Sequence, residues 1–150
     1  MSRRRDASTL DLFHDYAPKV VDRFEERDVR ASSLRERIAR AVAKALKDSA
    51  IDRSKLAADV SAYLGEDVTK NMLDQYASQA GTHAIPSHRL IALAIVTGQA
   101  AIINAALQDT GLVAIETKYE PLIEREMTRE AIDRLQQRLA TRDAQWKANR

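Results

Sequence analysis

Apolar residues recur three and four positions apart along most of this chain, which is the spacing that lines one face of a helix. The clearest examples are "LRERIARAVAKALK" and "SKLAADVSAYL", both rich in Ala, Leu, Arg, Lys and other good helix formers. No long stretch shows the alternation of apolar and polar residues that a half-buried strand requires. The pattern therefore predicts an all-α protein.

Residues that favour helix N-termini divide the central region into predicted helices. Ser33, Asp52 and Thr69 each precede a periodic segment and carry the side-chain oxygen that caps a first turn. Pro86 opens "SHRLIALAIVTG", a segment that is almost entirely apolar. We expect this helix to be the buried centre of the domain.

Glycines mark where these helices should end. Gly65 and Gly98 follow periodic segments and supply the left-handed residue that closes a helix. The segment "QAAIINAALQDTG" predicts a last short helix closed by Gly111, and "LVAIE" after it can form a short extended stretch. Residues 33–111 are therefore predicted to form a compact domain of five helices.

More polar segments flank this predicted domain. Residues 1–32 are predicted to form an N-terminal arm, with a short helix in "PKVVDRFEERDV" that turns Val20, Val21 and Phe24 inward. Residues 112–150 are predicted to form a helical tail. Its apolar seam consists of Ile132, Leu135 and Leu139 at coiled-coil spacing. Because a polar helix with one apolar seam rarely stands alone in water, we expect the tail to form a homodimer.

Composition narrows the class of protein. With 150 residues, 45% of them hydrophobic, the chain is long enough to bury a modest core without disulfides. It has no Cys, which excludes a disulfide framework and favours the reducing cytoplasm as its location. No apolar run is long enough for a membrane span or a signal peptide, so we expect a soluble protein with no membrane partner.

Candidate catalytic chemistry is absent from the sequence. The three histidines, at positions 14, 83 and 88, have no carboxylate at metal-ligand spacing beside them. There is no phosphate-binding glycine loop and no nucleophile elbow. We therefore expect neither an enzyme nor a protein that carries a metal or a small-molecule cofactor.

Charge is distributed unevenly along the chain. Residues 1–50 contain 12 basic and 9 acidic residues, whereas residues 51–100 contain 4 and 5. Arg37, Arg40, Lys44 and Lys47 form a basic stripe on the first predicted helix of the domain, and Arg3 to Arg5 begin the arm. Two interpretations remain open for these cations. They are either an ordinary solvated surface or the residues that contact a phosphate backbone.

The stretch "YLGEDVTKNMLDQYA", residues 63–77, predicts one helix that ends at Gly65 and a second that begins after Thr69. Two helices joined by a short turn at a glycine are typical of a helix-turn-helix. The bend lets the first helix cross the DNA backbone while the second lies in the major groove. Asn and Gln on an exposed face suit this role because an amide can pair with the edge of adenine.

Three segments together resemble a known family. "VTKNML" is similar to the start of the recognition helix in lambda-repressor-like domains, and "IPSHRLIALAIVTG" and "AAIINAAL" resemble the two helices that follow it there. The region most resembles small regulators of temperate and Mu-like phages, including the CII-type regulatory proteins. This resemblance implies a five-helix lambda-repressor-like fold and a cytoplasmic, homodimeric regulator of phage or prophage transcription that binds double-stranded DNA.

Individual residues of the chain are predicted to have three separate roles. The residues predicted to read bases are Lys70, Asn71, Asp74, Gln75 and Ser78. The residues predicted to bind phosphates are Arg37, Arg40, Lys44 and Thr69. The residues predicted to hold two copies together are Ile132, Leu135 and Leu139.

A second class of function remains open. A helical, non-enzymatic adaptor could use the tail and the N-terminal arm to recruit replication or transposition proteins. The segment "TLDLF", residues 9–13, resembles the apolar peptide that many bacterial proteins insert into the DNA sliding clamp, with Thr9 where Gln is usual. Its apolar residues can equally fold back onto the core.

Overall fold

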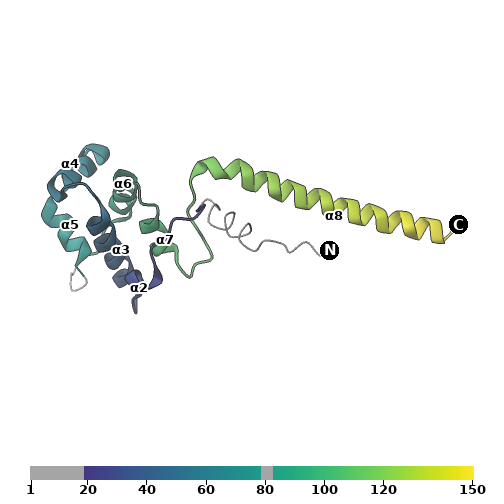
Figure 1. The fold of residues 1–150 in the computed structure, drawn as a ribbon, viewed down its shortest axis with the longest axis horizontal. Helices are drawn as coiled ribbons and strands as arrows, with labels where there is room; N and C mark the ends of the chain where they lie inside the picture. The colour runs from purple at the N-terminus through teal and green to yellow at the C-terminus, as the bar shows by residue number, and fades with distance from the viewer. Residues whose placement is uncertain (1–18, 79–82) are drawn as a thin grey trace, which may run out of the picture. The chain divides into compact units, whose positions relative to one another are not determined.

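The computed structural model describes residues 19–78 and 83–150, and in these residues every regular element is a helix (Figure 1). The all-α prediction is therefore confirmed. In order, the elements are α2 (Glu26–Val29), α3 (Leu34–Asp48), α4 (Arg53–Leu64), α5 (Lys70–Ala77), α6 (Ser87–Thr97), α7 (Ala101–Leu107), the 3-10 turn η1 (Thr117–Tyr119) and α8 (Glu120–Ala148). The chain divides into two compact units, one ending at Ile115 and the other running from Glu116 to Arg150.

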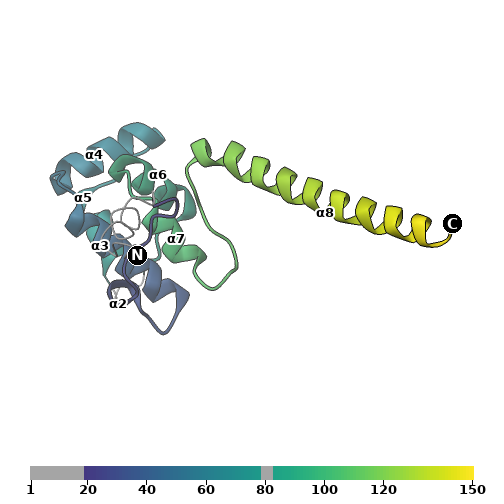
Figure 2. The same cartoon turned by 45° about the vertical axis from the view of Figure 1, so that its right-hand side comes forward.

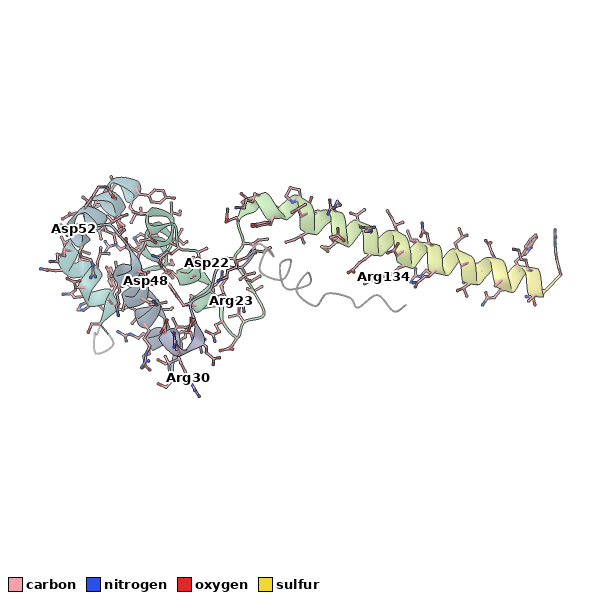
Figure 3. The ribbon with its side chains drawn as sticks, viewed as in Figure 1. Asp22, Arg23, Arg30, Asp48, Asp52 and Arg134 are labelled. Carbon is pink, nitrogen blue, oxygen red and sulfur yellow. The ribbon has the colours of Figure 1, made fainter. Side chains whose placement is uncertain are left out.

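The predicted N-caps of three helices are confirmed. The Ser33 hydroxyl accepts a hydrogen bond from the Glu36 amide at 3.2 Å, and the Thr69 hydroxyl accepts one from the Met72 amide at 3.2 Å. The Asp52 carboxylate, labelled in Figure 3, accepts two amides of the first turn of α4 at 2.9 and 3.4 Å. Each cap satisfies donors that would otherwise lack a partner inside the helix.

The predicted helix ends are confirmed at Gly65 and Gly98 and are wrong at Gly111. Both capping glycines have φ of +68°, which is the left-handed conformation that closes α4 and α6. Helix α7, however, already ends at Leu107. Arg37 on α3 binds the Gln108 carbonyl at 3.4 Å, so a contact distant in sequence is made where α7 ends.

The N-terminal helix is shorter than predicted. Among the described residues before α3, only Glu26–Val29 is helical, and Val20 is exposed, whereas Val29 is buried. The preceding backbone is held by α7, because the Asp22 carboxylate accepts the Ala101 amide at 3.1 Å. A segment whose polar groups are bound to another helix does not need to form its own helical turn.

Asn104 on α7 binds the backbone at two distant places, near Asp22 and within "LVAIE", where no strand forms. It is only 6% exposed, and its amide group donates to the carbonyls of Asp22 at 2.8 Å and Ala114 at 3.0 Å. Its side-chain oxygen accepts the Ala114 amide at 2.7 Å. The Asn104 amide thus holds both the segment before α2 and the segment after α7. The backbone of "LVAIE" pairs with this side chain and not with another strand.

The core lies among α3 to α7, which gather together in Figures 1 and 2. Helix α3 packs against α5 and α7, and α4 packs against α6. The largest fully buried side chains are Val42, Leu56, Val60, Leu73, Leu93 and Ile102. Helix α6 lies in the buried centre of the domain through its inner face, which carries Leu90 and Leu93. Its outer face is apolar but open, because Ile91 and Ile95 are 51% and 52% exposed.

Helix α8 is a continuous rod of 29 residues (Figure 1). Every one of its residues is exposed. Pro121 lies in its first turn, where the missing backbone donor costs no intrahelical hydrogen bond. The Thr128 and Thr141 hydroxyl groups donate to carbonyls one turn earlier, at 2.8 and 2.9 Å, so neither threonine interrupts the helix.

Candidate nucleic-acid interface

Helices α4 and α5 are joined by a turn of five residues that Ser61 holds in place. The Ser61 hydroxyl accepts the Val68 amide at 2.9 Å and lies 2.8 Å from the Ala57 carbonyl and 3.0 Å from the Val68 carbonyl. Val68 itself is buried at the base of the turn. The residue just before the cap of α5 is therefore fixed directly to α4.

A second network fixes α5 to α6. The Arg89 guanidinium on α6 donates to the Glu66 carboxylate at 2.7 Å and to the Tyr76 hydroxyl of α5 at 2.5 Å. His88 adds a contact of 3.1 Å to the same carboxylate. The hydrogen bond from Arg89 lowers the pKa of the Glu66 carboxyl group, and the pKa of Arg89 is raised in return. Arg89 thus holds the turn through Glu66 and the C-terminal part of α5 through Tyr76.

The outer face of α5 is open, as its periodicity predicted. Lys70, Asn71, Gln75 and Ser78 are all exposed. The side chains of Lys70, Asn71 and Gln75 make no hydrogen bond or ion pair within residues 19–78 and 83–150. Asp74 differs, because its carboxylate forms an ion pair with Arg53 at the start of α4. The helix therefore presents two free amides and a free cation on a firmly positioned backbone.

Three of the four cations in the basic stripe on α3 are paired within the protein, whereas Lys47 is exposed. Arg37 pairs with Asp109 at 3.0 Å, Arg40 pairs with Glu36 at 2.8 Å, and Lys44 pairs with Asp48 at 2.8 Å. The side chains of these three cations are only 16%, 31% and 31% exposed. Asp48 raises the pKa of Lys44, and Arg40 lowers the pKa of Glu36.

Because these three cations are already paired, phosphate binding by them would require the pairs to break. A phosphate would have to replace a carboxylate that already neutralises each cation, so each contact would gain less than a free cation provides. Thr69, the fourth residue predicted to bind phosphate, uses its hydroxyl to cap α5. Phosphate contacts by these four residues stay a prediction.

The segment that contains α4, the turn and α5 is not cationic. Between residues 52 and 78 there are three basic and five acidic residues, a net charge of −2. Three of the acidic side chains are paired: Asp59 with Lys55, Glu66 with Arg89 and Asp74 with Arg53. The segment has the shape and the amides for base contacts, but it supplies little attraction for a polyanion.

Ser61 and Arg89 position the candidate interface, although the sequence analysis did not identify them. Arg89 is the only charged residue inside the apolar helix α6, and a cation in that position requires a partner. That signal was present in the sequence. Ser61 lies four residues before Gly65, and only the folded turn shows that its hydroxyl meets Val68.

The other predicted features have different outcomes. Ile132, Leu135 and Leu139 lie along α8 and are 50%, 61% and 62% exposed. The "RRR" and "TLDLF" segments and His14 lie outside the described residues. In the described part of the chain, no helix is long and apolar enough to cross a bilayer. In those same residues, no three side chains of the metal-binding types are grouped to hold an ion.

No protein-family model, curated protein or solved structure matches this chain.

Proposed function

We propose that this chain is a sequence-specific DNA-binding regulator of a phage or prophage, with a lambda-repressor-like domain that reads the major groove through α5. The observation that carries the proposal is the free face of α5. Asn71 and Gln75 lie one turn apart with unsatisfied amide groups, and Lys70 lies beside them. Paired amides and a lysine are the side chains that recognise adenine and guanine edges.

The support around α5 favours recognition over a plain surface helix. Base contacts need donors and acceptors held in a narrow range of positions. Ser61 ties the start of α5 to α4, and Arg89 ties Tyr76 of α5 to α6. Five successive helices from α3 to α7, with the turn between the second and third, agree with the arrangement that the resemblance implies.

Phosphate contacts are the weaker part of the interface. Lys70 and Thr69 are placed at the start of α5, and Arg37, Arg40 and Lys44 can contribute only by exchanging their carboxylate partners. Each phosphate that a protein neutralises contributes about 0.9 to the slope of log affinity against log salt. We therefore expect specific binding with a shallow salt dependence, corresponding to roughly two to four phosphates.

Two copies of the chain would read a palindrome. A two-fold pair places its recognition helices in successive major grooves, about 34 Å apart. Helix α8, with its exposed seam of Ile132, Leu135 and Leu139, supplies a surface for pairing. Pairing doubles the number of bases contacted, which compensates for weak electrostatic attraction in each copy.

Selection of bound duplexes from a random pool tests the proposal. The full chain should enrich a palindromic sequence, and an Asn71→Ala/Gln75→Ala variant should lose this enrichment while keeping its helicity. Gln137→Ala on the outer face of α8 removes an exposed amide of the same kind and should leave the enriched sequence unchanged. Failure to enrich any sequence, or the same sequence from the Asn71→Ala/Gln75→Ala variant, would contradict the proposal.

The charge of the motif favours a second candidate, a helical protein-interaction adaptor. A net charge of −2 over residues 52–78 suits a surface that avoids nucleic acid. If the chain is an adaptor, we expect it to retain no DNA at any salt concentration. We also expect a protein partner to stay bound as salt is raised, whereas DNA would dissociate.

A further inference from the structure

The exposed seam of α8 extends beyond its three central residues. Six positions follow one another at alternating spacings of four and three residues, which is the heptad pattern of a coiled coil. The positions are Thr128, Ile132, Leu135, Leu139, Arg142 and Trp146. In heptad terms Ile132, Leu139 and Trp146 occupy a positions, and Thr128, Leu135 and Arg142 occupy d positions.

In the described structure this seam is open, apart from the Arg150 guanidinium, which lies 4.1 Å from the centre of the Trp146 ring. Leu135, Leu139 and Trp146 are 61%, 62% and 58% exposed, in a helix with no buried residue. Side chains of this size on one line of a long polar helix are costly in water, so the seam requires a partner.

The charges beside the seam identify that partner. In a parallel, in-register pair, the g residue of one heptad faces the e residue of the next heptad on the other helix. Glu124 at g then faces Arg129 at e of the second copy, and Arg138 at g faces Asp143 at e. Both charged pairs are opposite in sign, and two-fold symmetry repeats each of them.

These four side chains are among those that α8 leaves unpaired. The ion pairs within the helix join Arg125 to Glu126 and Arg134 to Glu130. In the described residues no ion pair involves the charged side chains at e and g, which are Glu124, Arg129, Arg138 and Asp143. The seam and its flanking charges are therefore both available to a second helix of the same sequence.

We infer that α8 binds α8 of a second copy as a parallel, in-register, two-stranded coiled coil. Ile at a followed by Leu at d favours two parallel strands, and Ile132 and Leu135 meet that pattern. This inference specifies the pairing proposed above and does not depend on DNA binding. Ile132, Leu135 and Leu139 form the apolar layers, and the Glu124–Arg129 and Arg138–Asp143 pairs set the orientation.

An antiparallel pair is less favourable at the contact. Aligning Leu135 with Leu139 of an antiparallel copy would bring Arg138 against Arg138. The N-terminal half of α8 is acidic and its C-terminal half is basic, which attracts antiparallel copies at longer range. Most of the charges behind this imbalance occupy outer positions, where water and salt screen them over about 10 Å. These residues are Glu126, Glu130, Asp133, Arg134 and Lys147.

Cysteine cross-linking of the full chain tests the orientation, because the chain has no cysteine of its own. Thr128→Cys occupies a d position without removing an apolar layer, and it should form a covalent dimer under mild oxidation. Gln137→Cys, at an outer f position, is the matched control and should remain uncross-linked. An antiparallel pair would instead cross-link a mixture of Thr128→Cys and Trp146→Cys, and that result would overturn the inference.

Charge reversal tests the pairs themselves. Arg138→Glu should raise the dimer dissociation constant roughly tenfold, measured by sedimentation equilibrium, because each copy then places Glu against Asp143. Adding Asp143→Lys to the same chain should restore pairing. Cross-linking only in the antiparallel manner would contradict the parallel orientation inferred here, although α8 would still pair with α8 of a second copy. A chain that stays monomeric would reject both, and DNA selection would still test α5 separately.

Discussion

Helices α3 and α8 are built from the same kinds of residue, yet they depend on the rest of the molecule in opposite ways. Helix α3 has four buried residues among 15, whereas α8 has none among 29. The α3 stripe is wide enough to face α5 and α7 together, and two of its cations, Arg37 and Lys44, reach carboxylates outside α3. Helix α8 has one narrow seam, and its internal ion pairs join residues of the same helix.

The difference shows that helix propensity decides neither packing nor function. Ala, Leu, Arg, Glu and Gln make both segments helical, but the width of the apolar stripe decides whether a helix joins the core. A wide stripe such as that of α3 is satisfied within one chain. A seam of single residues at heptad spacing is satisfied by another helix of the same shape.

The largest expected effect separates the two regions by stability. Leu56→Ala opens a cavity in the core of α3 to α7, where Leu56 is fully buried, and should lower the free energy of unfolding by about 2–5 kcal/mol. Leu139→Ala removes the same atoms from the α8 seam and should change that transition by less than about 0.5 kcal/mol. Urea unfolding monitored through helix content measures the change in unfolding free energy for both variants. Equal losses would show that the two regions are not distinct.

The next effect concerns the turn between α4 and α5. Ser61→Ala leaves the Val68 amide without its partner and should cost about 1–3 kcal/mol. Ser54→Ala, at an exposed position of α4, is the matched control and should be nearly neutral. Thermal unfolding compares the two variants. Similar melting temperatures for both would mean that Ser61 does not hold the turn.

A change that strengthens α8 sharpens the comparison further. Arg142 interrupts the seam between Leu139 and Trp146, and a parallel pair places it against its own copy. Arg142→Leu should therefore tighten the dimer at least about tenfold by sedimentation equilibrium. Arg134→Leu adds the same side chain at an outer position and should give no tightening. Equal effects from both would show that the gain is nonspecific.

The smallest expected effect is a dependence on pH. Because Arg89 lowers the folded-state pKa of Glu66, this carboxylate stabilises the fold above its unfolded pKa of about 4.3. The contribution is lost as pH falls from there through the lowered folded-state pKa. Glu66→Gln should thus destabilise the protein at pH 7 more than at pH 3. A loss of the same size at both pH values would exclude this charge effect.

Local signals in the sequence were sufficient where a helix begins or ends through its own residues. Ser33, Asp52 and Thr69 cap their helices, and Gly65 and Gly98 close theirs, because each acts on neighbours along the chain. The exposure of Asn71 and Gln75 also followed from helical periodicity alone. Their proposed role in reading bases depends on a partner that periodicity does not describe.

Features set by distant contacts did not follow from the sequence. The short α2 and the early end of α7 depend on Asp22, Asn104 and Arg37 binding groups about 70 to 80 residues away. The Arg37–Asp109 pair was hidden for the same reason, whereas the Arg40–Glu36 and Lys44–Asp48 pairs join residues four positions apart on α3. A basic stripe looks the same in a sequence whether its charges face solvent or the carboxylates of other elements.

The most direct test of the central claim measures affinity for the selected duplex and for a scrambled one across a range of salt concentrations. Asn71→Ala/Gln75→Ala should reduce the ratio of the two affinities to nearly one, because base contacts carry sequence information. The slope of log affinity against log salt should stay the same, because no phosphate contact is removed. An unchanged affinity ratio in the variant would show that α5 does not read DNA.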